Sequence, residues 1–268
     1  MSDKKEIKIQ IGVACGENCE YYVGFLTESI KKTISSNYNI EFIFGVSSVK
    51  VNVDLLKEQS SGFDYKIVYV IDQNNRSACS EGHGKTLNKI LENMDSEYGM
   101  FIDCDCALLE KGWDKKLMDK IEGNIVIVGS EYQDGNKYMN FPNAVFCMFK
   151  TNVLKGEKVS FSPRGRIKVD KENCEIYEKP IGEEIHLDVG WELYFKLKKS
   201  GYEGIHLPLI RGKSHDSVFM KEDMRGEEYQ LDGVPICTHV GRSSTRSFLN
   251  SPIVILWKER VQIWLNGN

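Results

Sequence analysis

The first 130 residues alternate between apolar runs of strand length and segments with apolar residues at helical spacing, which restricts the fold more than any other feature. Strands that alternate with helices in this way usually pair in parallel. The segment therefore predicts βαβ units around a mostly parallel sheet. The expected strands are residues 7–14, 40–46, 65–71, 99–102 and 124–128.

Helical periodicity between these runs predicts three helices. The first carries Tyr22, Phe25, Leu26 and Ile30 on one face. A polar, Gly-containing loop over 72–84 precedes the second, whose apolar face is formed by Leu87, Ile90, Leu91 and Met94. The third spans 113–121. In a parallel sheet the ligand lies at the carboxyl ends of the strands. The loops after Ala14, Val46, Ile71 and Ile102 are therefore expected to share one edge of the sheet.

The second half of the chain is less regular. Residues 155–179 are polar and predict an excursion or a mobile loop. Ser251 and Pro252 predict the start of a final helix, since Ser caps a helix and Pro fits its first position. Its apolar stripe (Leu256, Trp257, Val261, Trp264) is expected to pack on the protein. No repeat or linker divides 1–268, which predicts a single domain. The other expected elements are a buried strand at 141–149, a helix at 188–199 with Gly201 as its C-cap, and a strand at 205–209.

Composition limits the location and the partners. The 268 residues carry a net charge of −4, which gives no general attraction to nucleic acid or anionic lipid. No apolar run reaches the ~18 residues of a membrane span. The amino terminus lacks the pattern of a secretory signal, so we expect a cytoplasmic protein with no integral membrane segment. The eight cysteines lack the paired spacing of a zinc site, and we expect reduced, mostly buried thiols.

The sequence Asp103-Cys104-Asp105 follows an apolar strand. Side chains at positions i and i+2 of an extended segment point the same way, so both carboxylates can bind one hard cation. A divalent cation with open coordination positions can in turn bind a diphosphate. The alternative is a pair of aspartates that caps a turn. The motif predicts a metal and diphosphate site at the end of this strand.

The element order and this motif resemble the nucleotide-sugar-binding half of GT-A glycosyltransferases, particularly the inverting family 2. The resemblance implies a Rossmann-like α/β/α sandwich with a mostly parallel central sheet. Residues 1–130 would form the nucleotide-sugar-binding half, and 131–268 the acceptor-binding half with the C-terminal helix. It implies a transferase that moves a sugar from a nucleotide-diphosphate donor, a UDP- or GDP-sugar, to an acceptor hydroxyl.

The resemblance also implies donor-binding positions. The loops after the first two strands would hold the nucleoside, near Ala14, Cys15 and Ser47. Gly84 and Lys85 match the Gly-containing helix that precedes the aspartate motif in the family. The second strand ends in Val46-Ser47-Ser48, where the family usually has an acidic residue.

Two downstream segments complete the resemblance. Asp188 stands where inverting members carry the carboxylate that takes a proton from the acceptor hydroxyl, and the alternative is that it caps a helix. Its rivals are Glu183, Glu184 and Glu192.

His239 resembles the C-terminal metal-binding histidine of many GT-A enzymes, and Arg242 would contact phosphate. His215 is its main competitor. The set Asp103, Asp105 and His239 suits Mn²⁺, or Mg²⁺ as the second choice. Asn143 and Glu131 lie where sugar and acceptor contacts usually occur.

Two other functions stay open. Residues 79–86 resemble a P-loop that lacks its first glycine, which would make the protein an ATP- or GTP-dependent phosphotransferase. A non-catalytic nucleotide-binding module would need the aspartate motif but not Asp188. The acceptor is not specified: a glycan, a lipid, a protein or a modified nucleic acid would each fit.

Overall fold

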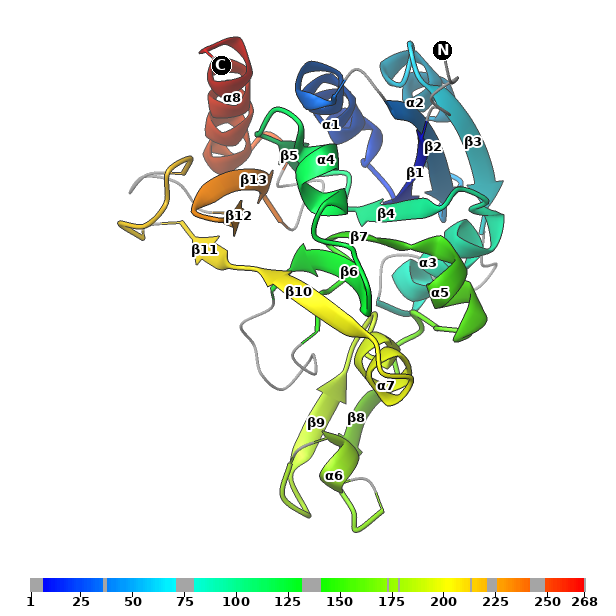
Figure 1. Cartoon of the computed structure of the whole chain (residues 1–268). Coiled ribbons are helices and arrows are strands. Elements are labelled where there is room, and N and C mark those ends of the chain that lie inside the picture. The colour runs from blue at the N-terminus through cyan, green and yellow to red at the C-terminus, as the bar shows by residue number, and fades with distance from the viewer. Residues whose placement is uncertain are drawn as a thin grey trace, which may run out of the picture.

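The computed structural model contains a large central sheet, a smaller second sheet and a projecting hairpin (Figure 1). It describes residues 7–35, 38–70, 80–131, 141–172, 174–177, 179–212, 214–220, 226–241 and 249–267. No helix in these ranges combines the length and the hydropathy that a membrane crossing requires.

The large sheet has seven strands in the order β10-β6-β7-β4-β1-β2-β3. Only β7 runs antiparallel to its neighbours; the other pairings in this sheet are parallel. The mostly parallel sheet predicted from the alternation is therefore confirmed. Its strands are β1 (Ile7–Cys15), β2 (Tyr38–Val46), β3 (Asp64–Tyr69), β4 (Tyr98–Ile102), β6 (Ile125–Ser130), β7 (Phe146–Lys150) and β10 (Glu203–Leu207).

The chain adds β2 and β3 on one side of β1 and then crosses to place β4 on the other side, so the order of connection reverses between β1 and β4. Parallel neighbours end at the same edge, so the loops after β1, β2 and β4 meet there, as the sequence predicted. Such a switch point is where open α/β sheets bind ligands. Residue 71, expected to end the third strand, lies outside the described ranges.

Helices cover both faces of the sheet. Successive side chains along each strand point to opposite faces, so the buried residues form two clusters, one on each face. Ile9, Ile11 and Val13 of β1 pack with α1 (Glu20–Thr33), α2 (Val53–Gln59) and α4 (Trp113–Met118). The opposite face packs against α3 (Ser80–Asn93), α5 (Thr151–Gly156) and α7 (Glu192–Lys199). Period-2 burial of a strand between two helical layers is the pattern of an α/β/α sandwich.

Two glycines bring α3 close to the sheet. A Cβ atom at Gly12 of β1 would lie 2.5 Å from Cγ2 of Ile90, and one at Gly45 of β2 would overlap the side chain of Thr86. Without side chains at these positions, the helix packs directly against β1 and β2. This close packing fixes where the first turn of α3 lies relative to the loop after β4.

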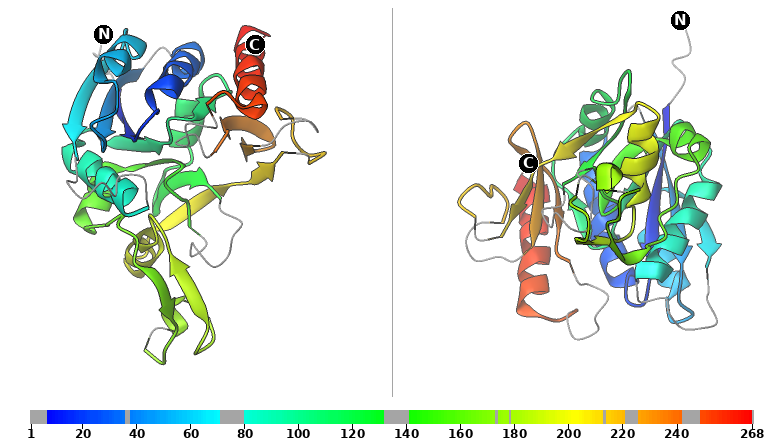
Figure 2. Two further views of the ribbon diagram at one scale, coloured as in Figure 1. Left: turned by 180° about the vertical axis from the view of Figure 1, so that it is seen from behind. Right: turned by 90° about the horizontal axis from the view of Figure 1, so that it is seen from below.

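The second sheet has the order β11-β12-β13-β5, formed by β11 (Leu209–Arg211), β12 (Glu227–Leu231), β13 (Val234–His239) and β5 (Cys106–Leu108). The final helix, α8 (Pro252–Gly267), lies with the β12–β13 hairpin on one side of the large sheet (Figure 2). Trp257 and Val261 of α8 are fully buried, which confirms the expected packing stripe. Trp257 Nε1 donates a hydrogen bond of 3.1 Å to Thr238 Oγ1 in β13. The C-terminal helix thus holds the strand that ends in His239.

The second half differs from the sequence prediction in three places. Residues 155–179 contribute to a projecting arm (Figure 1), which agrees with the predicted excursion, but the arm has regular structure and is not a loop. In it β8 (Gly165–Lys168) pairs with β9 (Glu184–Leu187), and α6 (Cys174–Tyr177) lies between them in the sequence. This arm projects away from the sheets (Figure 1). The expected strand at 205–209 is split at Pro208 into β10 and β11, which belong to different sheets. The strand expected at 141–149 begins only at Phe146.

Smaller differences affect the helices. The Gly-containing loop was predicted to reach residue 84, but α3 begins at Ser80. The helix expected at 113–121 ends at Met118. The helix expected from Asp188 begins at Glu192, and Gly201 at φ +81° follows its end as predicted.

Candidate functional site

The two aspartates lie where the chain passes from the large sheet to the second sheet. Asp103 follows β4, and its amide donates a 2.8 Å hydrogen bond to the carbonyl of Val145. The Asp103 carbonyl accepts from the amide of Cys106, which closes a turn, and β5 then pairs with β13. The turn therefore brings both carboxylates to the carboxyl end of β4, as the motif predicted.

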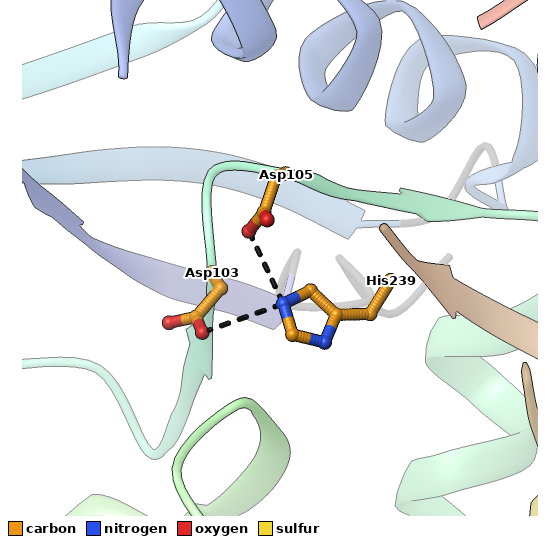
Figure 3. A group of neighbouring side chains, drawn as sticks. All are labelled: Asp103, Asp105 and His239. Atoms are coloured by element: carbon orange, nitrogen blue, oxygen red, sulfur yellow. Dashed lines mark ion pairs between the residues drawn. The ribbon is translucent and has the colours of Figure 1, made fainter. Parts of the chain in front are cut away.

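His239 is the last residue of β13 and lies directly opposite Cys106 of β5. Its ring points between the two aspartates (Figure 3). Nε2 of His239 is 3.3 Å from Oδ1 of Asp105 and 3.8 Å from Oδ2 of Asp103. One ligand atom from each residue lies within 4.8 Å of the others. The predicted proximity of these three side chains is confirmed; their role as metal ligands stays a prediction.

The site concentrates negative charge in a largely buried position. Burial raises the pKa of Asp103 above its usual value; His83 and His239 lower it, while Asp105 and Glu227 raise it further. Burial alone would lower the pKa of His239, but the Asp105 charge and hydrogen bonds with Asp105 and Glu227 hold it well above its usual value. Three carboxylates thus lie around one imidazole, and acidic side chains grouped in this way can hold a cation.

Two further side chains join this group without having been predicted. Glu227 of β12 places Oε2 2.9 Å from Nδ1 of His239. His83, in the first turn of α3, places Nε2 3.9 Å from Oδ1 of Asp103. The only sequence signal for Glu227 is its position in the apolar–polar alternation of 227–231, which does not reveal the neighbouring strand.

The ends of β1 and β2 are joined by hydrogen bonds. The Ser47 amide and hydroxyl both donate to the carbonyl of Cys15, at 3.0 and 3.2 Å. Burial raises the pKa of the Cys15 thiol, and this side chain faces the core. Ala14 is half-buried. These loops can therefore offer main-chain groups to a ligand, and the predicted donor contacts of Ala14, Cys15 and Ser47 stay predictions.

Gly84 and Lys85 lie within α3. A Cβ atom at Gly84 would overlap the carbonyl oxygen of Phe161, so the glycine permits close packing of the helix on that segment. Asn88 Oδ1 accepts a 2.7 Å hydrogen bond from the amide of Phe161. Lys85 forms a 2.9 Å ion pair with Glu81. Helical structure from residue 80 differs from a P-loop, whose glycines form a loop before the helix.

Asp188 is buried in the connection between β9 and α7. Its Oδ1 accepts a 2.9 Å hydrogen bond from the amide of Val189. The predicted helix-capping alternative is wrong, because the N-cap position of α7 is Trp191. Among its rivals, Glu192 forms an ion pair with Lys196 and Glu184 lies near Arg166 on the arm.

The structure describes three of the four remaining candidates. Arg242 is outside the described residues. His215 is exposed and does not belong to the group around Asp103. Asn143 is buried, where its Oδ1 accepts hydrogen bonds from the Ser130 hydroxyl and the Val145 amide. Glu131 accepts a 3.4 Å hydrogen bond from the amide of Leu209.

Comparison with known proteins identifies solved structures that are similar to this chain. No protein-family model matches the chain, and no curated protein matches it. The mannosyltransferase PcManGT from Pyrobaculum calidifontis, solved with GDP-Man and Mn²⁺, superposes with a TM-score of 0.52 at 9% identity, over 76% of this chain and 56% of that one. The chain therefore has the GT-A fold of this enzyme.

Two further solved structures match a shorter part of the chain. S. aureus TarS 1-349 gives a TM-score of 0.46 at 15% identity, over 58% of this chain and 50% of that one. Glucosyl-3-phosphoglycerate synthase from Mycobacterium tuberculosis gives 0.41 at 15% identity, over 56% and 59%. The chain thus spans about half the length of the structures that it matches.

Proposed function

We propose that this protein is a metal-dependent glycosyltransferase that moves a sugar from a nucleotide-diphosphate donor to an acceptor hydroxyl. The observation that carries the proposal is the convergence of Asp103, Asp105 and His239 at the switch point of a GT-A sheet. The mannosyltransferase of the same fold was solved with a nucleotide sugar and Mn²⁺.

The donor set fits a divalent cation. Two carboxylates and one imidazole offer mixed oxygen and nitrogen ligands, which suit Mn²⁺ better than Mg²⁺, a cation that prefers oxygen. All three side chains are at least three-quarters buried, at 23%, 4% and 12% exposure. Burying this excess of acid is costly without a counter-charge. When bound, the cation would neutralise charge on the departing diphosphate.

The ends of β1 and β2 lie at the same edge of the sheet, so we place the nucleoside there. Ala14, Cys15 and Ser47 would contribute main-chain groups, since the Cys15 thiol is buried. Gly84 and Lys85 of α3 and Arg242 are the remaining proposed donor contacts. A UDP- or GDP-sugar is the proposed donor class.

Asp188 is the proposed general base. Its carboxylate would accept the proton of the acceptor hydroxyl while that oxygen forms a bond to the anomeric carbon. The bond from this carbon to the diphosphate oxygen breaks, and its electron pair leaves with the diphosphate. A single displacement of this kind inverts the anomeric configuration.

The proposed location is the cytoplasm. The cysteines within the described ranges are free thiols, which suits a reducing compartment. The proposed function needs a nucleotide-sugar donor and an acceptor that carries a hydroxyl, and it needs no other cofactor than the metal ion.

A donor panel tests the proposal. Thermal midpoints are measured with UDP-, GDP-, CDP- and dTDP-sugars, with and without Mn²⁺, on the wild type and on Asp105→Asn. We expect one nucleotide-sugar class to raise the midpoint of the wild type only when Mn²⁺ is present, and to be hydrolysed slowly. The variant should show neither effect. Stabilisation by ATP alone, with no response to any nucleotide sugar, would instead indicate the phosphotransferase.

A further inference from the structure

Glu227 contacts the side of the His239 ring that faces away from the aspartates. The two residues are directly opposite each other in the antiparallel pair of β12 and β13. Oε2 of Glu227 lies 2.9 Å from Nδ1 of His239, while Nε2 of the same ring faces Asp105 at 3.3 Å. The imidazole is therefore held between one carboxylate behind it and two in front of it.

A second hydrogen bond fixes the Glu227 carboxylate. The Tyr229 hydroxyl donates to the same Oε2 at 2.7 Å. The main chain of Glu227 is also held, because its carbonyl accepts a 3.0 Å hydrogen bond from Thr238 Oγ1. Thr238 in turn accepts from Trp257 of α8, so this geometry is anchored to the C-terminal helix. The Glu227 side chain is 25% exposed, which leaves its carboxylate little freedom to turn away.

An imidazole binds a metal through a nitrogen lone pair and keeps its proton on the other nitrogen. A carboxylate that accepts a hydrogen bond from that second nitrogen selects the tautomer, orients the ring and makes the ligating nitrogen more basic. We propose that Glu227 is the positioning residue of this site: it accepts the Nδ1 hydrogen of His239 and thereby presents Nε2 to a divalent cation held by Asp103 and Asp105. The inference rests on the proposed function.

The test measures Mn²⁺ affinity by electron paramagnetic resonance, without donor or turnover, for the wild type, for Asp105→Asn and for four variants of the β12–β13 hairpin. Glu227→Ala should weaken Mn²⁺ binding by about 10- to 100-fold. Glu227→Gln keeps a carbonyl oxygen that can accept from Nδ1 and should recover part of that loss. Tyr229→Phe should weaken binding by less than about tenfold, since it removes one hydrogen bond to the carboxylate. Asp232→Asn is the matched control.

Asp232 lies in the turn of the same hairpin, 74% exposed and paired with Lys120 at 3.1 Å, so its variant should bind Mn²⁺ like the wild type.

Nitrogen NMR of the Zn²⁺-loaded protein reports the tautomer of His239, which would not change if Glu227 only stabilised the fold. In the wild type, His239 should show a protonated Nδ1 and a metal-bound Nε2. Glu227→Gln should retain this pattern and Glu227→Ala should lose its single tautomer.

The outcomes separate this inference from the proposed function. Wild-type Mn²⁺ affinity in Glu227→Ala, with binding lost in Asp105→Asn, would overturn the positioning role alone. No Mn²⁺ binding by the wild type would overturn both. If Glu227→Ala does not fold, Glu227→Gln and Tyr229→Phe decide the matter: wild-type Mn²⁺ affinity in both variants would contradict the positioning role.

Discussion

The central sheet carries a charged cluster at each end of its parallel strands, and the two clusters differ in charge balance. At the amino ends, Lys8 and Lys66 both pair with Glu41, at 2.9 and 3.2 Å. The same two lysines lie 3.5 and 3.6 Å from Asp95. Two positive groups thus face two negative groups. Gln10 adds hydrogen bonds to both carboxylates.

At the carboxyl ends, three carboxylates surround the imidazole of His239. Asp105, Asp103 and Glu227 all lie within 3.8 Å of one of its ring nitrogens. The amino-end carboxylates thus face two lysines, whereas the carboxyl-end carboxylates face the imidazole groups of His239 and His83. A cation bound at the carboxyl end would balance the carboxylates there, which is the proposed role of the metal ion.

The largest expected effect comes from Asp105→Asn. Removing one of the three proposed ligands should weaken Mn²⁺ binding by more than about 100-fold. The free energy of unfolding of the metal-free protein should change by less than about 1 kcal/mol, because the lost ion pair with His239 is offset by the lost repulsion between Asp105 and Asp103. Calorimetric titration and chemical denaturation measure the two quantities. A large loss of metal-free stability would break the comparison, since Asp105 would then stabilise the fold as Glu41 does.

The next effect concerns turnover. Asp188→Asn should lower the rate of sugar transfer by about 10²- to 10⁴-fold, because it removes the proposed general base. Mn²⁺ and nucleotide affinity should stay unchanged, since Asp188 lies in another connection. Glu184→Gln is the control, as Glu184 is an exposed carboxylate on the adjoining strand. Unchanged turnover in Asp188→Asn would reject the residue as base.

Glu41→Gln removes one negative charge from the cluster at the amino ends of the strands. The substitution should lower the free energy of unfolding by about 1–3 kcal/mol, because it weakens hydrogen bonds made to a buried charge. Metal affinity should not change. Denaturant unfolding followed by circular dichroism measures the effect. Loss of Mn²⁺ binding in this variant would show that the two ends of the sheet are coupled.

The same variant has a predicted pH dependence. Burial raises the pKa of Glu41, but the hydrogen bonds from Gln10, Lys8 and Lys66 outweigh it and hold the pKa below its usual value. A carboxyl with a lowered folded pKa contributes stability above its unfolded pKa and loses it as the pH falls through the folded value. The stability difference between wild type and Glu41→Gln should therefore be largest near neutral pH and shrink in acid. A constant difference across this range would contradict the assignment.

The smallest effect is expected for Lys66→Met. Lys66 is 40% exposed, so its ion pairs are partly screened by solvent. We expect a loss of less than about 1 kcal/mol in unfolding free energy, reduced further at high salt. Denaturation at low and high ionic strength measures it. A loss as large as that of Glu41→Gln would mean that Lys66, more than Gln10, compensates the buried carboxylate.

Local patterns predicted the central sheet well and the second half poorly. The strand ending at Ile102 and the aspartates after it follow from apolar runs and their spacing. The arm at 165–187 was missed because its two alternating segments, 166–169 and 184–187, are short and are separated by a mostly polar stretch. The start of α7 was misplaced because Asp188 and Gly190 suit a helix start, while the chain makes a turn there, with Gly190 at φ +85°.

The sequence by itself determined the alternating strands and helices, the parallel sheet and the position of Asp103 and Asp105 at its carboxyl end. These depend on residues close together in the chain. Only the tertiary structure decided that β13 lies between β5 and β12, which brings His239 between Asp105 and Glu227. Pairing of distant strands depends on how whole elements pack, and no local pattern encodes which strand becomes the neighbour.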